Sequence, residues 1–255
     1  MKKQIPNIFT LLNLFFGCIA IVYALQNGID VEYNNEGGQF IKLTEKMYMA
    51  SLFIGLASAV DFLDGFIARL LKVPSEMGKQ LDSLADVVSF GVAPGILLYQ
   101  FLRMGFIREN EGMETAAIWL MPAFIYSCAG AYRLARFNLD TSQSFGFKGV
   151  PIPAAGLVIA SFPLIYWNSD NETIVNLLCN KWFLYGVILL LSALMISRLP
   201  MMALKFNDFT VKNNLPKIIL FIIAVIAVIF LKWLAVPAIF IAYIILSLVL
   251  NKKQS

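Results

Sequence analysis

The segment "KMYMASLFIGLASAVDFLDGFIARLL", residues 46–71, decides the fold class of this chain because it reads as a membrane-spanning helix. A bilayer crossing needs about 20 mostly apolar residues. Near its end, however, the segment carries Asp61 and Asp64, and the next apolar segment, "GKQLDSLADVVSFGVAP" (78–94), carries Asp82 and Asp86. An isolated carboxylate inside a membrane costs about 2.5–3.5 kcal/mol. Four of them in neighbouring segments therefore indicate a function.

The composition extends this reading to the whole chain. Of 255 residues, 59% are hydrophobic and only 14% are charged, which lies far from soluble averages. We therefore predict an all-α polytopic membrane protein with about eight transmembrane helices, at residues 7–26, 46–71, 80–102, 116–138, 150–167, 182–198, 215–231 and 233–250. Only Lys232 interrupts the last two apolar segments, which predicts a tight helical hairpin.

The chain contains no histidine, and its three cysteines are scattered over predicted helices. The missing histidine excludes a Ser-His-Asp triad, a histidine-ligated zinc site and a histidine nucleophile. An odd number of dispersed cysteines predicts neither a disulfide framework nor a metal site. A catalytic base must then be a carboxylate, a lysine, a tyrosine or a thiol.

Charge predicts the orientation of the helices in the membrane. The first apolar segment shows no small-residue cleavage pattern, so we expect it to be retained as a membrane span. With eight spans and a cytoplasmic N-terminus, most of the 20 basic residues fall on the cytoplasmic side, while the acidic loops "NGIDVEYNNEGG" and "RENEGME" fall outside. We therefore predict an integral protein of the cytoplasmic (inner) membrane with both termini and the active site facing the cytoplasm.

Helical spacing places the carboxylates together. Asp61, Asp64, Gly65 and Ala68 share one face of a helix, and Gly78, Asp82 and Asp86 follow one another at intervals of four on the next. A short turn joins the two segments. Four carboxylates are thus expected to point at a common place, beside residues that have almost no side chain.

An all-oxygen cluster without His or Cys ligands suits a hard divalent cation, so we expect Mg²⁺ or Mn²⁺, and two ions rather than one. The glycines leave room for a phosphate to approach the backbone. Two other interpretations stay open at this point: buried structural ion pairs, and a proton or cation relay in an ion-coupled transporter. The transporter is the less favoured, because no internal repeat is visible.

The pattern D61-x2-D64-G65-x2-A68-R69-x8-G78-x3-D82-x3-D86 resembles the complete signature of the CDP-alcohol phosphotransferase family. The resemblance implies a six-helix membrane core, two divalent metal ions and transfer of a phosphatidyl group from a CDP-linked lipid to an alcohol, with release of CMP. It also implies a homodimer. On this basis we divide the chain into a core domain, residues 1–200, and a C-terminal extension of two further helices, residues 201–255.

Further segments resemble the phosphatidylserine synthase branch, in which the acceptor is L-serine. They are "IPNIFTLLNLFFG" (5–17), "LDSLADVVSFGVAP" (81–94), "YRLARFN" (132–138) and "GVPIPAAG" (149–156). The predicted reaction is direct attack of the serine hydroxyl on CDP-diacylglycerol. Rival acceptors for the same chemistry are glycerol 3-phosphate, inositol phosphate and choline, but a phosphorylated acceptor calls for a more basic pocket than this chain offers.

The resemblance also implies roles for individual residues. Asp61, Asp64 and Asp82 are the expected metal ligands, and Asp86 is expected to act both as a ligand and as the general base. The residues expected to bind the CDP-lipid are Gly65, Ala68, Arg69 and Gly78. Asn7 and Thr10 are expected to reach its head group, with a simple helix start as the alternative.

Three basic residues form the predicted acceptor site. Arg133 and Arg136 lie three apart, hence on one helix face, and Lys148 follows in the next loop. Arginine suits a carboxylate or a phosphate because its planar guanidinium donates two parallel hydrogen bonds. The alternative is that both arginines only mark the membrane border by extending toward the interface.

Overall fold

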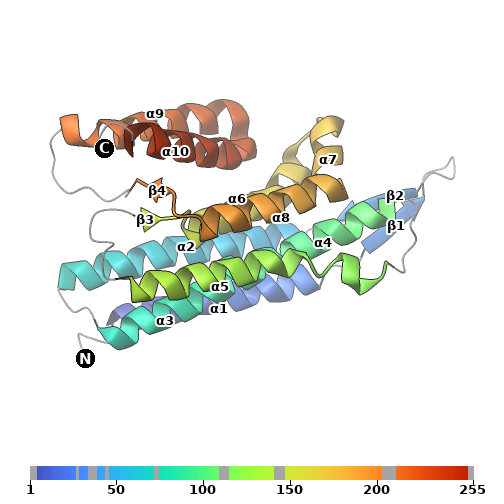
Figure 1. Cartoon of the computed structure of the whole chain (residues 1–255). Coiled ribbons are helices and arrows are strands. Elements are labelled where there is room, and N and C mark those ends of the chain that lie inside the picture. The colour runs from blue at the N-terminus through green and yellow to red at the C-terminus, as the bar shows by residue number, and fades with distance from the viewer. Residues whose placement is uncertain are drawn as a thin grey trace.

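The structure is a computed structural model that describes residues 5–26, 29–33, 39–43, 46–71, 75–108, 115–140, 147–202 and 211–251. Its long helices run alongside one another in a bundle, and the last two helices lie along one side of it (Figure 1). The helical core opens with α1 (Ile5–Leu25), α2 (Lys46–Leu71), α3 (Glu76–Asp86), the π-helical turn η2 (Val87–Val92), α4 (Ala93–Arg108) and α5 (Ala123–Leu139).

The remaining helices are α6 (Ile152–Asn168), α7 (Glu172–Leu178), α8 (Lys181–Ile196), α9 (Val211–Leu231) and α10 (Ala235–Asn251), with short 3₁₀ turns at Ala117–Trp119 and Lys232–Leu234. Each of the eight predicted spans coincides with a helix. Among the described residues, four helices are long and apolar enough to cross a membrane, or five if the bent pair α7 and α8 is one span. The architecture is that of an all-α membrane protein, and the count of eight spans stays a prediction.

Small residues let the helices of the core approach closely. A Cβ atom on Gly17 of α1 would lie 2.9 Å from the Cα atom of Ser89, and one on Gly156 of α6 would lie 3.1 Å from the carbonyl oxygen of Phe90. Real Cβ atoms essentially never approach another atom to 2.9 Å, and 3.1 Å is closer than nearly all of their contacts. Membrane helices associate through this kind of packing because lipid supplies no hydrophobic drive between them. The α3–α4 segment is therefore held from two sides.

The π-helical turn η2 follows Asp86 directly, whereas the sequence predicts an unbroken α-helix there. Two hydroxyls of α5 bond to carbonyl oxygens of this turn: Tyr126 donates to Phe90 at 2.8 Å, and Ser127 donates to Gly91 at 2.8 Å. Such turns occur often beside functional sites. Here the turn is locked against α5 immediately after one of the four aspartates.

The C-terminal hairpin comprises α9, the 3₁₀ turn and α10, and it confirms the turn predicted at Lys232. Lys232 adopts a positive φ of 49°, and α10 returns alongside α9 (Figure 1). The backbone next to the short strand β4 (Pro200–Met201) attaches the hairpin to the core. Tyr243 donates a hydrogen bond to the Met202 carbonyl at 3.0 Å, and the Met202 amide donates to Ser247 at 3.1 Å. Few hairpin residues are buried, and many apolar side chains of α9 are exposed, which suits a lipid environment.

Besides the π-helical turn, three further features were not predicted. The loop between the first two spans contains an antiparallel pair, β1 (Ile29–Tyr33) and β2 (Gln39–Leu43), and a second short pair joins β3 (Phe147–Lys148) to β4 (Pro200–Met201). The helix α7 precedes α8 at an angle of 63°. All three are short elements at the ends of the bundle, where the apolar pattern that marks spans carries no information.

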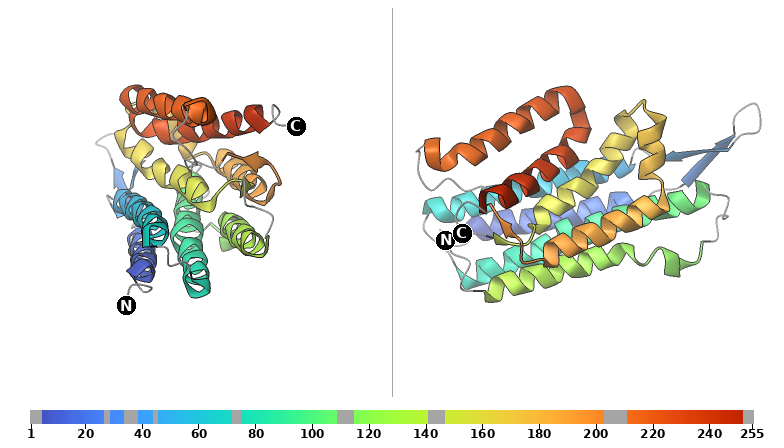
Figure 2. Two further views of the ribbon diagram at one scale, coloured as in Figure 1. Left: turned by 90° about the vertical axis from the view of Figure 1, so that its left-hand side faces the viewer. Right: turned by 45° about the horizontal axis from the view of Figure 1, so that its top comes forward.

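The first and last described helices place both ends of the described chain at the same end of the bundle, as expected for an even number of membrane crossings. The start of α1, the end of α2, the start of α3 and the end of α10 lie at the same end of the bundle (Figure 2). The β1–β2 pair lies at the opposite end. The loops that were predicted to share one side of the membrane therefore lie at one end of the bundle. Which end faces the cytoplasm stays a prediction.

Candidate active site

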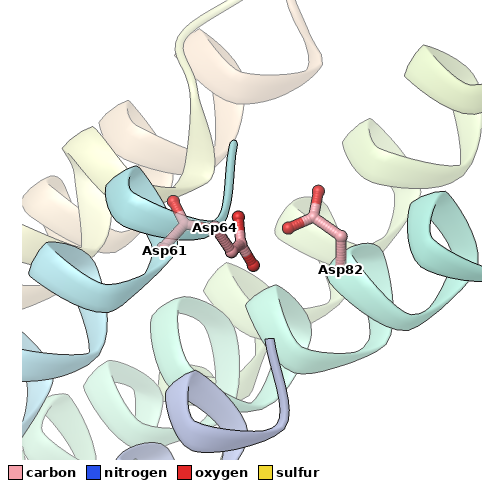
Figure 3. Close-up of side chains that lie close together, drawn as sticks. All are labelled: Asp61, Asp64 and Asp82. Atoms are coloured by element: carbon pink, nitrogen blue, oxygen red, sulfur yellow. The ribbon is translucent and has the colours of Figure 1, made fainter. Parts of the chain in front are cut away.

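Three of the four aspartates converge between α2 and α3. One carboxylate oxygen from each of Asp61, Asp64 and Asp82 lies within 4.8 Å of the others. Figure 3 shows Asp61 and Asp64 on α2 facing Asp82 across the gap between the helices. The i, i+3 spacing on α2 and the short connection to α3 therefore bring the carboxylates together, as the sequence predicts.

The fourth aspartate, Asp86, is buried at the end of α3 and lies within interaction range of the other three carboxylates. Helix α1 donates a side-chain hydrogen bond to one aspartate of α2 and to one aspartate of α3. Thr10 donates a hydrogen bond to Asp64 Oδ2 at 2.7 Å, and Asn13 Nδ2 donates to Asp86 Oδ1 at 3.3 Å. Asn13 is a site residue that sequence reasoning missed, although the polar spacing of Asn7, Thr10 and Asn13 was its signal.

A polar cavity of about 240 Å³ opens beside the cluster, between α1, α2 and α3. Most residues predicted to bind the CDP-lipid line it. The lining residues are Pro6, Asn7, Thr10, Asp64, Gly65, Ala68, Ser75, Gly78, Lys79 and Asp82. The backbone of Arg69 belongs to α2, but its side chain lies outside the described part of the structure.

Gly78 has no side chain, and the side-chain oxygens of Ser75 and Asn7 lie close to the position that a Cβ atom would occupy. A Cβ atom there would lie 2.9 Å from Ser75 Oγ and 3.1 Å from Asn7 Oδ1. Ser75 caps α3 by accepting a hydrogen bond from the Gly78 amide at 2.9 Å. Asn7 lies in the first turn of α1, so a role in the helix start and a role at the head group both stay predictions.

Arg133 of α5 is buried, and its Nε has no hydrogen-bond partner in the described part of the chain. Its guanidinium lies 5.3 Å from the ring centroid of Phe137 and interacts electrostatically with Asp86 of α3 and Tyr243 of α10. A buried donor without a partner is costly. Arg133 therefore places a positive charge, and an Nε–H group without a hydrogen-bond partner among the described residues, within electrostatic range of Asp86.

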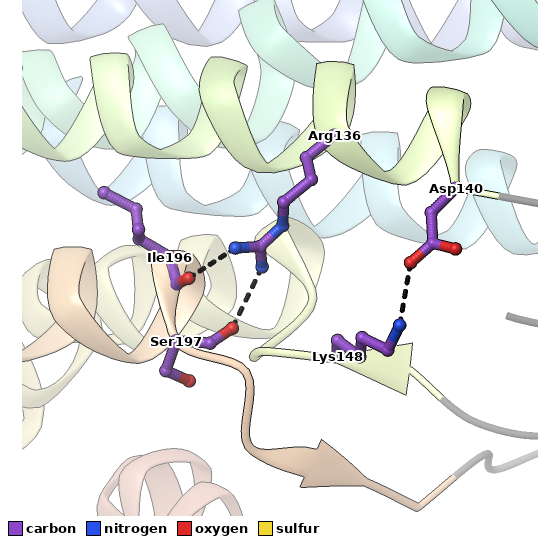
Figure 4. A network of polar contacts seen from close by, with 5 residues as sticks. All are labelled: Arg136, Asp140, Lys148, Ile196 and Ser197. Carbon is purple, nitrogen blue, oxygen red and sulfur yellow. Dashed lines mark hydrogen bonds and ion pairs between the residues drawn. The ribbon is translucent and has the colours of Figure 1, made fainter. Parts of the chain in front are cut away.

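Arg136 and Lys148, the two other predicted acceptor residues, have partners in the fold (Figure 4). Arg136 donates to the carbonyl oxygens of Ile196 and Ser197 at 2.6 and 2.9 Å. These are carbonyls at the end of α8, where a cation is favourable because backbone acceptors there lack helical partners. Lys148 forms an ion pair with Asp140 at 3.0 Å.

Residues 3–199 match the family model described as CDP-alcohol phosphatidyltransferase, and this match contains the aspartates, the polar cavity and Arg133. The chain belongs to the CDP-alcohol phosphatidyltransferase family. As a family member with long apolar helices, it is an integral membrane protein and a phosphotransferase. The match ends before the C-terminal hairpin.

Three curated relatives are similar to this family member over much of its length. The chain is 31% identical to a CDP-diacylglycerol–serine O-phosphatidyltransferase of Helicobacter pylori, over 98% of this chain and 96% of that one. It is 36% identical to the protein of the same description from Bacillus subtilis, over 63% and 76%. It is 29% identical to an archaetidylserine synthase of Methanothermobacter thermautotrophicus, over 65% and 60%. The similarity to the H. pylori protein extends through the hairpin.

The donor set fits the divalent cation on which the family generally depends. The converging atoms are carboxylate oxygens, and hard cations such as Mg²⁺ and Mn²⁺ prefer oxygen ligands. Two of the carboxylates are oriented by hydrogen bonds from α1, as is usual for groups that ligate metals. The identity and number of the ions stay predictions.

Thr10 supplies a test of this orientation. We expect Thr10→Val to raise the Mn²⁺ concentration for half-maximal activity by about 10- to 100-fold, because a hydrogen bond that orients a ligand is worth that much. Thr10→Ser keeps the hydroxyl and should stay near wild type. The measurement is CMP release against free Mn²⁺. Equal metal dependence in the valine and serine variants would show that Thr10 only packs.

Proposed function

We propose that this protein transfers the phosphatidyl group of CDP-diacylglycerol to the hydroxyl of L-serine, which yields phosphatidylserine and CMP. The observation that carries the proposal is the convergence of three aspartates beside a polar cavity lined by the small residues of the family signature. The names of the relatives support serine as the acceptor. Family membership argues against an ion-coupled transporter.

Asp61, Asp64, Asp82 and Asp86 are the residues proposed to hold Mg²⁺ or Mn²⁺, as two ions. A bound divalent cation supplies charge neutralisation at the phosphoryl oxygens. Gly65, Ala68 and Gly78 let the cytidine diphosphate lie against the backbone of α2 and α3. Asn7 and Lys79, which line the cavity, are proposed to contact its polar groups. Arg69 is proposed for the same role from the family resemblance alone.

The serine hydroxyl oxygen attacks the phosphorus that bears the diacylglycerol, and the bond from that phosphorus to the oxygen shared with CMP breaks. Asp86 accepts the hydroxyl proton, and CMP leaves with the bridging oxygen. No residue becomes covalently modified, in keeping with a chain that has no histidine. Asp86 lies outside the group of three converging carboxylates and accepts a hydrogen bond from Asn13, which supports the proposal that it acts as the base.

Arg133 is the proposed contact for the serine carboxylate. It is buried, carries a donor without a partner and interacts with Asp86, the proposed base. Arg136 donates to the Ile196 carbonyl, and Lys148 pairs with Asp140. Of the three predicted acceptor residues, we therefore propose Arg133 as the one that contacts the serine carboxylate. Arginine is suited to this role because its fork matches a carboxylate.

Further parts of the proposal concern the whole protein. The positive-inside pattern supports the inner membrane, with the cluster and both termini on the cytoplasmic side. The boundary between a core of residues 1–200 and an extension of residues 201–255 agrees with the end of the family match. A homodimer is proposed from the family resemblance alone.

The deciding experiment presents purified protein with CDP-diacylglycerol and a panel of acceptors. We expect CMP release with L-serine to exceed that with glycerol 3-phosphate, inositol phosphate or choline, because one buried arginine suits a single carboxylate. Phosphatidylserine should form in equal amount to CMP. Faster release with a phosphorylated acceptor would reject serine and keep the family chemistry.

The same assay separates the two arginines. Removing a charge-assisted contact in a buried site costs about 2–5 kcal/mol, so Arg133→Gln should raise the KM for serine by about 30-fold or more. Its effect on the KM for CDP-diacylglycerol should be smaller. Arg136→Gln is the matched control, expected to lower the melting temperature while leaving the KM for serine within about threefold.

A further inference from the structure

A second cavity, of about 460 Å³, borders the aspartate cluster at Asp61. It is bounded by α2, by the start of α6 and by the C-terminal hairpin. Its lining residues are Ser58, Asp61, Phe62, Pro151, Pro153, Ala154, Leu157, Val158, Leu220, Val236, Ile239, Phe240 and Tyr243. Its volume falls within the usual range for ligand sites.

Each cavity borders the aspartate cluster, but the two differ in character. Asp64 and Asp82 line the polar cavity, and Asp61, within 4.8 Å of both by its carboxylate, lines the second one. Apart from Ser58, Asp61 and Tyr243, every group lining the second cavity is apolar. The Tyr243 hydroxyl already donates to the Met202 carbonyl. An apolar cavity of this kind holds hydrocarbon better than water.

We propose that the C-terminal hairpin closes this second cavity into a slot for one acyl chain of the lipid donor. The proposal rests on the proposed function, because it assumes a CDP-linked lipid whose phosphates lie at the cluster. Such a substrate is polar at one end and hydrocarbon at the other. The molecule offers a polar and an apolar cavity that border different carboxylates of one cluster, Asp64 and Asp82 for the first and Asp61 for the second.

The C-terminal hairpin supplies one wall of the second cavity. Leu220 of α9 and Val236, Ile239, Phe240 and Tyr243 of α10 form the wall opposite α2 and α6. These residues lie outside the segment that matches the family model, which ends at residue 199. The hairpin therefore adds selection for the donor chain to a core that carries the chemistry.

The test compares two isoleucines of α10. Ile239 lines the slot, whereas Ile241 is 56% exposed on the outer surface of the hairpin. Ile239→Trp fills the slot, and Ile241→Trp is the matched control. Each methylene kept out of an apolar site costs about fourfold in binding, so displacing two or three should lower kcat/KM by about 10- to 60-fold.

The donors are CDP-diacylglycerol with two oleoyl chains and the analogue with two six-carbon chains. We expect Ile239→Trp to lose activity on the long-chain donor, to remain within about threefold of wild type on the short-chain donor, and Ile241→Trp to change neither. Retained short-chain activity shows that the proposed reaction is intact. Equal losses on both donors, or no loss on either, would overturn the slot.

Photo-crosslinking with a CDP-diacylglycerol that carries a diazirine in mid-chain gives a readout without turnover. We expect labelled peptides from α6 and α10, protected by unlabelled CDP-diacylglycerol and not by phosphatidylcholine. Equal protection by both lipids would assign the cavity to bulk membrane lipid and reject the proposal. Failure of wild-type protein to release CMP with any acceptor would reject the proposed function instead.

Discussion

Asp64→Ala is expected to reduce CMP release by at least about 10³-fold. Asp64 is buried, accepts a hydrogen bond from Thr10 and lies within 4.8 Å of Asp61 and Asp82 through its carboxylate oxygen. Losing it removes a proposed ligand of the ion that stabilises charge on the phosphoryl group, an effect worth several kcal/mol. Asp61→Ala and Asp82→Ala should behave in the same way, and excess EDTA should abolish wild-type turnover reversibly.

A binding readout separates lost ligation from lost folding. Mn²⁺ should raise the melting temperature of wild-type protein, because a ligand that binds only the folded state stabilises it, and this rise should vanish in Asp64→Ala. Without metal the variant should melt no lower than wild type, since a buried carboxylate has been removed. Asp170→Ala, at an exposed loop position, is the control with both properties unchanged. Full turnover in excess EDTA would refute the metal site.

Asp86→Asn is expected to lower phosphatidyl transfer by about 10² to 10⁴, the usual worth of a positioned general base. The amide keeps the shape of the side chain, and its oxygen can still accept the hydrogen bond that Asn13 donates to Asp86. The fold, the affinity for CDP-diacylglycerol and the Mn²⁺-dependent rise in melting temperature should therefore persist. Single-turnover measurement of phosphatidylserine formation tests the chemical step directly.

Asp82→Asn is the variant that distinguishes loss of metal binding from loss of the general base. Asp82 lies in the three-carboxylate cluster and lines the polar cavity, so its amide variant should lose both metal stabilisation and activity. Asp86→Asn should lose activity alone. Near wild-type transfer by Asp86→Asn would show that another group accepts the proton, and Asp86 would then be only a metal ligand.

The four aspartates were predictable because their placement depends on local geometry. Spacings of three and four residues put Asp61 beside Asp64, and Asp82 beside Asp86, on a helix of any protein. A short connection then forces the two helices to be neighbours. The acceptor residues were less predictable, because the same helix spacing that groups Arg133 with Arg136 does not say which of them meets a carbonyl of α8.

The sequence by itself determined where the helices lie and which face of each carries carboxylates, because apolar length and helical periodicity act within one segment. Only the tertiary structure decided which helices meet when they lie far apart in the chain. Thr10 and Asn13 reach aspartates that are 54 and 73 residues away, and the hairpin comes to lie beside Asp61. Such contacts depend on how closely helix surfaces pack at glycine and alanine positions, and no local pattern in the chain encodes that pairing.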